Sequence, residues 1–405
     1  MKNIIRTILV IVLTVAVSGV LSSCGFSSFD GDLRARYDYN LKEYIKGGKY
    51  SGIEVFVGNT DVTDQELKNA VNRNRVFGAD WTDIYDRPSK EGDIVGVTYQ
   101  GYTTEEGKSK EDRRIAELCK GFYKDEPVSS DLEELSNSSS KTLSIVLGSD
   151  ELFPGFDKQI IGLSVGDRKT LTYTLPEPCW EYPAYSGQTI EVDVLVTYIQ
   201  EIQYKEYNDE YASESGYGDV ENYEFTMKNS LIKTRTAQVE NYVNTRVWEQ
   251  IHDNFEVKKY PEKELGENRE KLMRSYNNQA ELSKMTLEEY VDQKLGISMD
   301  KFNERLQTEA EYATKDEMII YYIARSEKMG LLDADYEEKA LEKAQEENFS
   351  DLDQYIVFRA YYYEGVENGE EVTEEMRTQA ENNLKQEILF EMIDDFVYEN
   401  TVQKK

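Results

Sequence analysis

Histidine and cysteine are scarce in this chain of 405 residues, which holds one histidine (His252) and three cysteines (Cys24, Cys119 and Cys179). A single histidine excludes a metal site built from several histidines and argues against a Ser-His catalytic arrangement. The sequence also lacks a CxxC pair, a glycine-rich phosphate-binding loop and any carboxylate motif with metal-ligand spacing. We therefore expect no cofactor and no metal.

Basic residues are outnumbered, with 47 Lys and Arg against 79 Asp and Glu, and the formal net charge is −32. Nucleic-acid binding needs Lys and Arg to replace the counterions of the phosphates, so the composition argues against a nucleic-acid partner. It also argues against broad contact with anionic lipid. A charged surface rich in tyrosine suits a soluble protein that touches other polypeptides.

Long hydrophobic runs are missing after the first residues, so the sequence predicts no second membrane pass. Residues 1–23 have the pattern of a signal peptide, with Lys2 and Arg6 before an apolar run over 8–20. The run ends in Leu-Ser-Ser-Cys at Cys24, which resembles a bacterial lipobox. That resemblance implies cleavage before Cys24, lipidation of its thiol and an extracytoplasmic, membrane-anchored protein. The alternative is an ordinary signal peptide or membrane anchor.

Strand-like alternation dominates residues 143–199. A strand is predicted over 143–147, followed by a short amphipathic helix in which Phe156, Ile160, Ile161 and Leu163 share a face. Further strands are predicted over 168–175 and 189–198, the last with alternating apolar residues. Strand, short helix, strand, loop and strand indicate an antiparallel sheet wrapped around one helix.

Two blocks of this region resemble the FKBP-type prolyl isomerase domain in the version carried by trigger factor. They are VLGSDELFPGFDKQIIGLSVGDRKTL at 146–171 and EGDIVGVTYQG at 91–101. The resemblance implies an α+β protein: an isomerase domain over 91–202, then an all-α chaperone domain over 203–405. Residues 24–36 are predicted to be a linker. Residues 37–90 are predicted to be a strand-helix segment that packs with the chaperone domain, and the ribosome-binding domain of trigger factor is expected to be absent.

The resemblance also implies a site for proline-containing polypeptides. Its catalytic residues would be Tyr99, Phe153 and Phe156, with Phe156 at the floor of an aromatic pocket and the backbone N–H of Phe153 holding the substrate carbonyl. The substrate-binding residues implied with them are Leu143, Ile145, Leu152, Trp180, Tyr182 and Val192. The alternative for each apolar residue is ordinary core packing.

The family pattern is interrupted by a charged insert at 110–140, in which a short helix is predicted over 112–118. Cys119 and Cys179 are expected in loops bordering the pocket, either as a disulfide or as free thiols. The usual flap aromatic cannot be placed, and Leu143 and Val192 replace residues that are often aromatic. These departures imply weak isomerase activity, or binding without turnover.

Helical periodicity takes over after Gln203. Helices are predicted over 231–255, 262–281, 286–295, 299–329, 335–348, 351–363 and 374–398. Aromatic clusters at 321–323, 355–358 and 361–363 would either bind unfolded clients or pack between helices. The sequence as a whole predicts a lipid-anchored foldase with isomerase and holding activities. The alternative is a non-enzymatic holdase or scaffold whose isomerase domain only binds peptides, while a solute-binding lipoprotein is disfavoured because no paired α/β lobes can be read.

Overall fold

The computed structural model describes residues 37, 39–110, 113–120, 142–150, 152–153, 155–329, 333–363 and 372–405. The predicted signal peptide, Cys24, the linker and most of the insert lie outside these residues. By internal contacts the chain divides into two compact units. We call the first, residues 57–242, the sheet unit, and the second, residues up to Phe56 together with 243–404, the helical unit.

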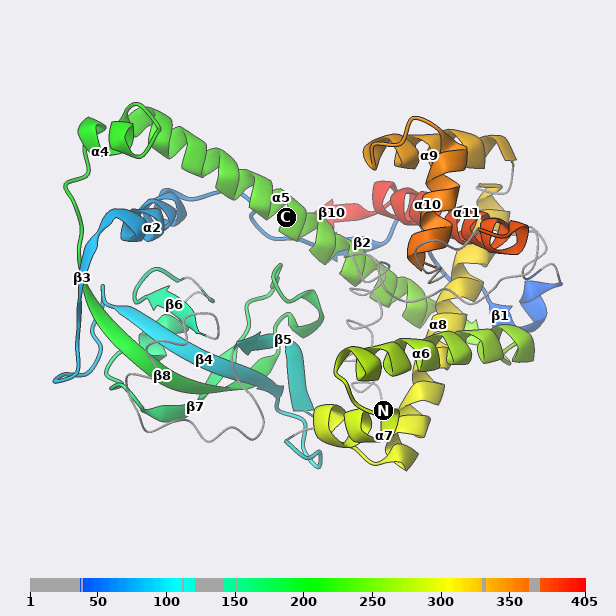
Figure 1. The fold of residues 1–405 in the computed structure, drawn as a ribbon, viewed down its shortest axis with the longest axis horizontal. Helices are drawn as coiled ribbons and strands as arrows, with labels where there is room; N and C mark the ends of the chain where they lie inside the picture. Colours follow the sequence, from blue (N-terminus) through cyan, green and yellow to red (C-terminus); the bar gives the residue numbers. More distant parts are fainter. Residues whose placement is uncertain are drawn as a thin grey trace. The chain divides into compact units, whose positions relative to one another are not determined.

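The sheet unit contains a six-stranded sheet in which β8 is the central strand (Figure 1). β8 pairs antiparallel with β4 along one side and with β7 and β3 along the other, while β5 and β6 pair with β4. The strands of this sheet are β3 (Asp80–Asp83), β4 (Ile94–Thr103), β5 (Arg114–Lys120), β6 (Leu143–Val146), β7 (Arg168–Thr174) and β8 (Thr189–Gln203). β4 is buried along its whole length, so this strand lies in the core of the unit.

Helical segments of the sheet unit flank these strands. They are α2 (Asp64–Arg75), α4 (Asp209–Glu214), the first part of α5 (Val220–Asn254) and the 3₁₀ turns η4 (Val76–Gly78), η7 (Asp157–Gln159) and η8 (Pro183–Tyr185). α2 begins with a capping box, since Thr63 and Glu66 each accept a backbone N–H from the other. Val71 of α2 packs in a cluster with Tyr211 and Tyr223.

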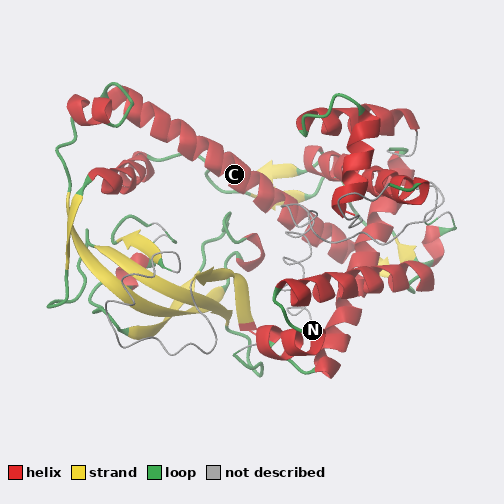
Figure 2. Cartoon of the chain, viewed as in Figure 1, coloured by secondary structure: helices red, strands yellow, loops and turns green. Residues whose placement is uncertain are grey.

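The helical unit is built almost entirely of helices, with two short strand pairings, β1 with β9 and β2 with β10 (Figure 2). Its helices are the end of α5, α6 (Glu262–Leu282), α7 (Leu287–Tyr290), α8 (Met299–Glu327), α9 (Asp333–Glu346), α10 (Leu352–Tyr363) and α11 (Glu374–Glu399). Shorter elements are η3 (Leu41–Glu43), the π-helical turn η9 (Val291–Leu295), β1 (Ile45–Lys46), β2 (Glu54–Phe56), β9 (Glu256–Val257) and β10 (Val402–Lys404). An α+β fold with a helical C-terminal region is therefore confirmed.

Buried polar contacts join segments that are distant in the sequence of the helical unit. The hydroxyl of Tyr37, fully buried, donates to Glu317 of α8 at 2.9 Å, and its ring lies 5.0 Å from that of Tyr321. Tyr276 of α6 donates to Glu309 of α8 at 3.0 Å. These contacts fix the register of the packed segments, because each buried hydroxyl needs its particular acceptor.

The aromatic clusters of the helices are mostly interior. Tyr321 and Ile323 are fully buried, and Tyr355 is 5% exposed. Phe358 and Tyr361 differ, with 39% and 37% of their surfaces exposed. Packing between helices, rather than client binding, accounts for the buried members.

Several local predictions are wrong. Residues 114–120 form strand β5 rather than a helix over 112–118, because they pair with β4. Cys119 therefore lies on a strand and not in a loop. The predicted helix after Phe156 is only the turn η7, and Ile161 is exposed rather than on its buried face. Phe77 follows α2 in the turn η4 and is 90% exposed.

The described part of the chain contains no helix that is both long enough and apolar enough to cross a membrane.

Candidate functional site

One face of the sheet carries several of the residues expected in the site. Tyr99 of β4 lies opposite Val194, and two residues along β4 Gly101 lies opposite Val192. Ile145 and Leu143 of β6 lie opposite Val95 and Val97 of the same strand β4. Because cross-strand partners point to one face and alternate residues share it, Tyr99, Leu143, Ile145 and Val192 lie on one side of the sheet.

The segment after β6 is folded into a tight turn. Gly148 and Gly155 have φ of +93° and +79°, which side chains other than glycine rarely tolerate. Asp157, 1% exposed, accepts the N–H of Gly148 at 2.6 Å, and Asp150 accepts that of Gly155 at 2.6 Å. These two carboxylates hold the backbone on either side of Phe153.

Four aromatic side chains are in contact at this turn: Phe153, Phe156, Tyr173 and Tyr182. We call these four residues the aromatic cluster. Phe153 stacks on Tyr173 with ring centroids 5.3 Å apart, and Phe156 meets Tyr173 edge-on at 5.7 Å. Phe153 also contacts the ring of Tyr182 at 5.5 Å and that of Phe156 at 5.5 Å. Tyr173 lies opposite Ile190 on β8, on the face that carries Val192, so the cluster covers that face.

The cluster has a buried part and a more accessible part. Phe153 and Phe156 are 1% and 0% exposed, whereas Tyr173 and Tyr182 are half-buried. Burial, and after it the nearby phenol of Tyr99, raises the pKa of Tyr182 far above its usual value. Burial likewise raises the pKa of Tyr173. Both hydroxyls therefore stay protonated at neutral pH, and each keeps a proton that it can donate to a carbonyl oxygen.

The other residues implied by the resemblance are placed as follows. Leu152, half-buried, directly precedes Phe153. Trp180 is half-buried and has different partners: its Nε1 donates to the carbonyl of Val57 at 3.1 Å, and Arg235 of α5 lies 4.5 Å from its ring centroid. Trp180 thus ties its loop to two other parts of the sheet unit.

Tyr173 and Tyr185 are members of this region that sequence reasoning missed. Tyr185 is 3% exposed and lies in η8, close to Tyr182. The alternation of Leu171 and Tyr173 in β7 was a signal for Tyr173, because Leu171 pairs with Val192 and alternate residues of a strand share a face. No comparable local pattern marks Tyr185.

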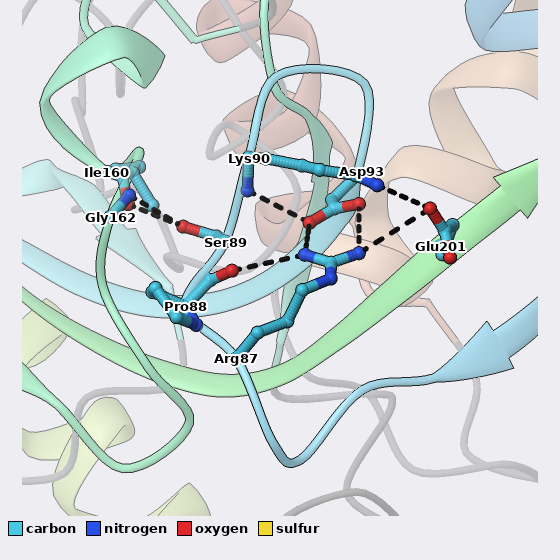
Figure 3. A network of polar contacts seen from close by, with 8 residues as sticks. All are labelled: Arg87, Pro88, Ser89, Lys90, Asp93, Ile160, Gly162 and Glu201. Carbon is cyan, nitrogen blue, oxygen red and sulfur yellow. Dashed lines mark hydrogen bonds and ion pairs between the residues drawn. The ribbon is translucent and has the colours of Figure 1, made fainter.

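A polar network supports the turn from the side of the loop before β4 (Figure 3). The hydroxyl of Ser89 donates to the carbonyl of Ile160 at 2.9 Å and accepts the N–H of Gly162 at 3.1 Å. The same loop is closed by Arg87, whose guanidinium makes two hydrogen bonds to the buried carboxylate of Asp93, at 2.6 and 3.0 Å. The ion pair therefore positions Ser89, and Ser89 holds the segment that follows Phe156.

Both described cysteines are free thiols in this structure. Burial raises the pKa of Cys179 to about 11, so its thiol is protonated and unreactive at neutral pH. The described residues also contain no group of three His, Cys, Asp or Glu side chains that could hold a metal ion. The arrangement offers apolar aromatic surface and phenol donors, which suit binding and desolvation rather than nucleophilic chemistry.

The sequence was compared with family models and with known proteins. A family model described as "Bacterial trigger factor protein (TF) C-terminus" matches residues 219–358, from the start of α5 into α10. Trigger factor from Staphylococcus carnosus is 26% identical over 313 residues, or 76% of this chain and 64% of the relative. Trigger factor from Macrococcus caseolyticus is 26% identical over 295 residues, or 72% of this chain and 62% of the relative.

This chain is trigger factor-like. The aligned part spans somewhat less than two thirds of the length of these relatives. A solved structure is described as "Promiscuous Substrate Recognition in Folding and Assembly Activities of the Trigger Factor Chaperone". Its alignment with the trigger factor-like chain covers 87% of this chain and 73% of the solved chain, with 19% identity and a TM-score of 0.31. The expected trigger factor-like character of the chain is confirmed by the family model and the relatives.

Proposed function

We propose that this trigger factor-like protein is a foldase that catalyses prolyl cis-trans isomerisation and holds unfolded exported polypeptides. The observation that carries the isomerase proposal is the aromatic cluster on the sheet face of Tyr99 and Val192. The C–N bond of a prolyl peptide resists rotation because of its partial double-bond character, with a barrier of about 18–20 kcal/mol. An apolar surface that removes water from the imide and favours its twisted form lowers this barrier without a nucleophile or a metal.

The phenols supply the polar part of this mechanism. Tyr182 and Tyr173 are half-buried and protonated, and either can donate to the carbonyl that precedes the proline. Phe153 and Phe156 form the apolar base beneath them. The backbone N–H of Phe153, implied by the resemblance as a donor, remains part of the proposal.

The proposed location is outside the cytoplasm, at the membrane, through lipid on Cys24. Lys2, Arg6 and the apolar run before Leu21-Ser-Ser-Cys24 support this proposal. Labelling of expressing cells with radioactive palmitate tests it: the full chain is expected to carry label, and Cys24→Ala is expected to lose it. Label that persists in Cys24→Ala would refute lipidation at this residue.

A non-enzymatic holdase is the second candidate. It is favoured by the burial of Phe153 and Phe156: these rings are 1% and 0% exposed, so protein atoms already cover the surface that a proline would contact. In that case the fold of the isomerase serves as a platform and the holding activity alone matters.

The rate of cis-to-trans conversion of a short Xaa-Pro peptide separates the two. We expect the wild-type protein to accelerate it, and Tyr182→Ala to lower the acceleration at least about fivefold by removing a donor and a ring of the cluster. Phe225→Ala, which removes an aromatic ring of α5 that is 64% exposed, is the matched control and should leave the rate unchanged. Suppressed aggregation of an unfolded client without any acceleration would refute the isomerase and leave the holdase.

A further inference from the structure

The edge of the sheet at β3 differs from its other borders. β3 pairs with β8 on one side, and within the described residues no strand lies on its other side. The N–H of Ile84 donates to the carbonyl of Ile199 at 2.9 Å. Because the groups of an antiparallel strand alternate in direction, Asp80, Thr82 and Ile84 face β8, whereas the N–H and C=O groups of Trp81 and Asp83 point to the open side.

Three large aromatic residues are exposed in β3 or next to it: Phe77 in the turn η4 before the strand, Trp81 within it and Tyr85 two residues after it. Phe77 is 90% exposed, Trp81 53% and Tyr85 64%. Trp81 and Tyr85 are four residues apart and share the face of Asp83, which receives a hydrogen bond from Gln200 at 2.8 Å. Ile84 pairs with Ile199, and Ile199 lies opposite Val95, which also lies opposite Ile145 on the face of the aromatic cluster. Trp81 and Asp83 alternate with Ile84, so they lie on the other face of the sheet. The edge is thus separate from the proposed isomerase site.

The charge along residues 76–86 has one sign. This segment, VFGADWTDIYD, contains Asp80, Asp83 and Asp86 and neither lysine nor arginine, and it lies between Arg75 and Arg87. All three carboxylate-bearing residues are exposed. Natural proteins guard an open edge strand by keeping it short, by charging it or by covering it, because unpaired N–H and C=O groups recruit other strands. β3 is short and carries two aspartates, which repel a second copy of this acidic chain but attract a cationic strand.

We propose that the β3 edge binds an extended, cationic segment of an unfolded polypeptide as an added strand. The outward N–H and C=O groups of Trp81 and Asp83 would pair with the backbone of the segment. On the face shared by Trp81, Asp83 and Tyr85, its lysine or arginine side chains would pair with Asp83 and lie over the two rings, where cations are attracted to the ring faces. The proposal names a client-binding surface that is independent of prolyl isomerisation.

The test uses proline-free peptides, so that its outcome does not depend on the isomerase. The full-length protein would be titrated into a dye-labelled peptide of alternating lysine and valine while fluorescence anisotropy is recorded. We expect Trp81→Ala to weaken binding at least about fivefold, and N-methylation of every second amide of the peptide to do the same. Phe225→Ala, which removes a ring on α5 with 64% exposure, is the matched control and should bind as the wild type does.

Charge is tested with a peptide of alternating glutamate and valine, which should bind at least about fivefold more weakly than the lysine peptide. Equal binding by Trp81→Ala, or equal binding of the N-methylated peptide, would overturn strand addition at β3, because diffuse attraction to a protein of charge −32 would explain the result. Trp81→Ala should keep the wild-type rate of prolyl isomerisation. A variant that loses both activities would show that the edge is not a separate site.

Discussion

The carboxylate of Asp93 offers the sharpest test of how the candidate site is supported, through the variant Asp93→Asn. Asp93 is 1% exposed and receives two hydrogen bonds from Arg87 and one from the N–H of Lys90 at 2.9 Å. The pairing with Asp93 raises the pKa of Arg87. In the variant one accepting oxygen becomes an NH₂ group that faces donors, and the remaining bonds lose the help of the charge.

The expected cost follows from these contacts. A hydrogen bond to a charged group contributes about 1.5–3 kcal/mol, against about 0.5–1.5 kcal/mol for a neutral one. Arg87 keeps about a quarter of its side chain exposed, so solvent screens part of the interaction. We expect the free energy of unfolding to fall by about 2 kcal/mol in Asp93→Asn, a change far above that of a surface ion pair.

Urea titration followed by tryptophan fluorescence measures this change. Trp81 and Trp180 belong to the same unit as Asp93, and a shared Trp248→Phe background removes the signal of the helical unit. Glu201→Gln is the control: Glu201 pairs with Lys90 and, at 3.8 Å, with Arg87, but its side chain is 44% exposed, so the variant should lose much less stability than Asp93→Asn. The reasoning fails if Asp93→Asn is as stable as the wild type, or if the two variants lose the same amount.

Three further predictions concern other buried groups. Phe156→Ala removes a fully buried ring and should lower the free energy of unfolding by about 3–5 kcal/mol, measured by urea titration, whereas a loss below about 1 kcal/mol would contradict its place in the core. Burial lowers the pKa of His252 to about 3, so its imidazole should stay neutral as the pH falls from 7 to 5, and an NMR titration with a midpoint near 6.5 would disprove this. Burial raises the pKa of Glu387, but Arg359 and Lys343 lower it more, and the net shift is downward. Stability from Glu387 is therefore present above its unfolded pKa of about 4.5 and lost as the pH falls through the lower folded value; thermal melts should show a shallower acid dependence in Glu387→Gln.

Helix ends and strand alternation could be predicted from the sequence, because their causes are local. Thr286 and Glu289 are three residues apart and form the predicted capping box at the start of α7. Gly296 ends η9 in the left-handed conformation that glycine adopts freely. The start of α5 was harder, since it begins at Val220, eleven residues before the apolar period that marked it.

Residues 114–120 show where local reasoning stops. Their composition suggested a helix, yet they form β5 because β4 provides a partner. The side-chain amide of Gln100 on β4 donates to the backbone carbonyl of Ile115 on β5 at 2.8 Å, and this bond helps to fix the pairing of the two strands. A partner strand contributed by another part of the chain outweighs a weak helical preference.

The sequence by itself determined the α+β class, the trigger factor-like order of elements and the place of Phe153 and Phe156 in the turn after β6. The tertiary structure alone decided that Tyr173 completes the aromatic cluster and that Trp180 has other partners. It also decided that Trp81 stands exposed at an open strand edge. The physical reason is that periodicity and caps act over a few residues, whereas burial depends on which distant segments pack against each side chain.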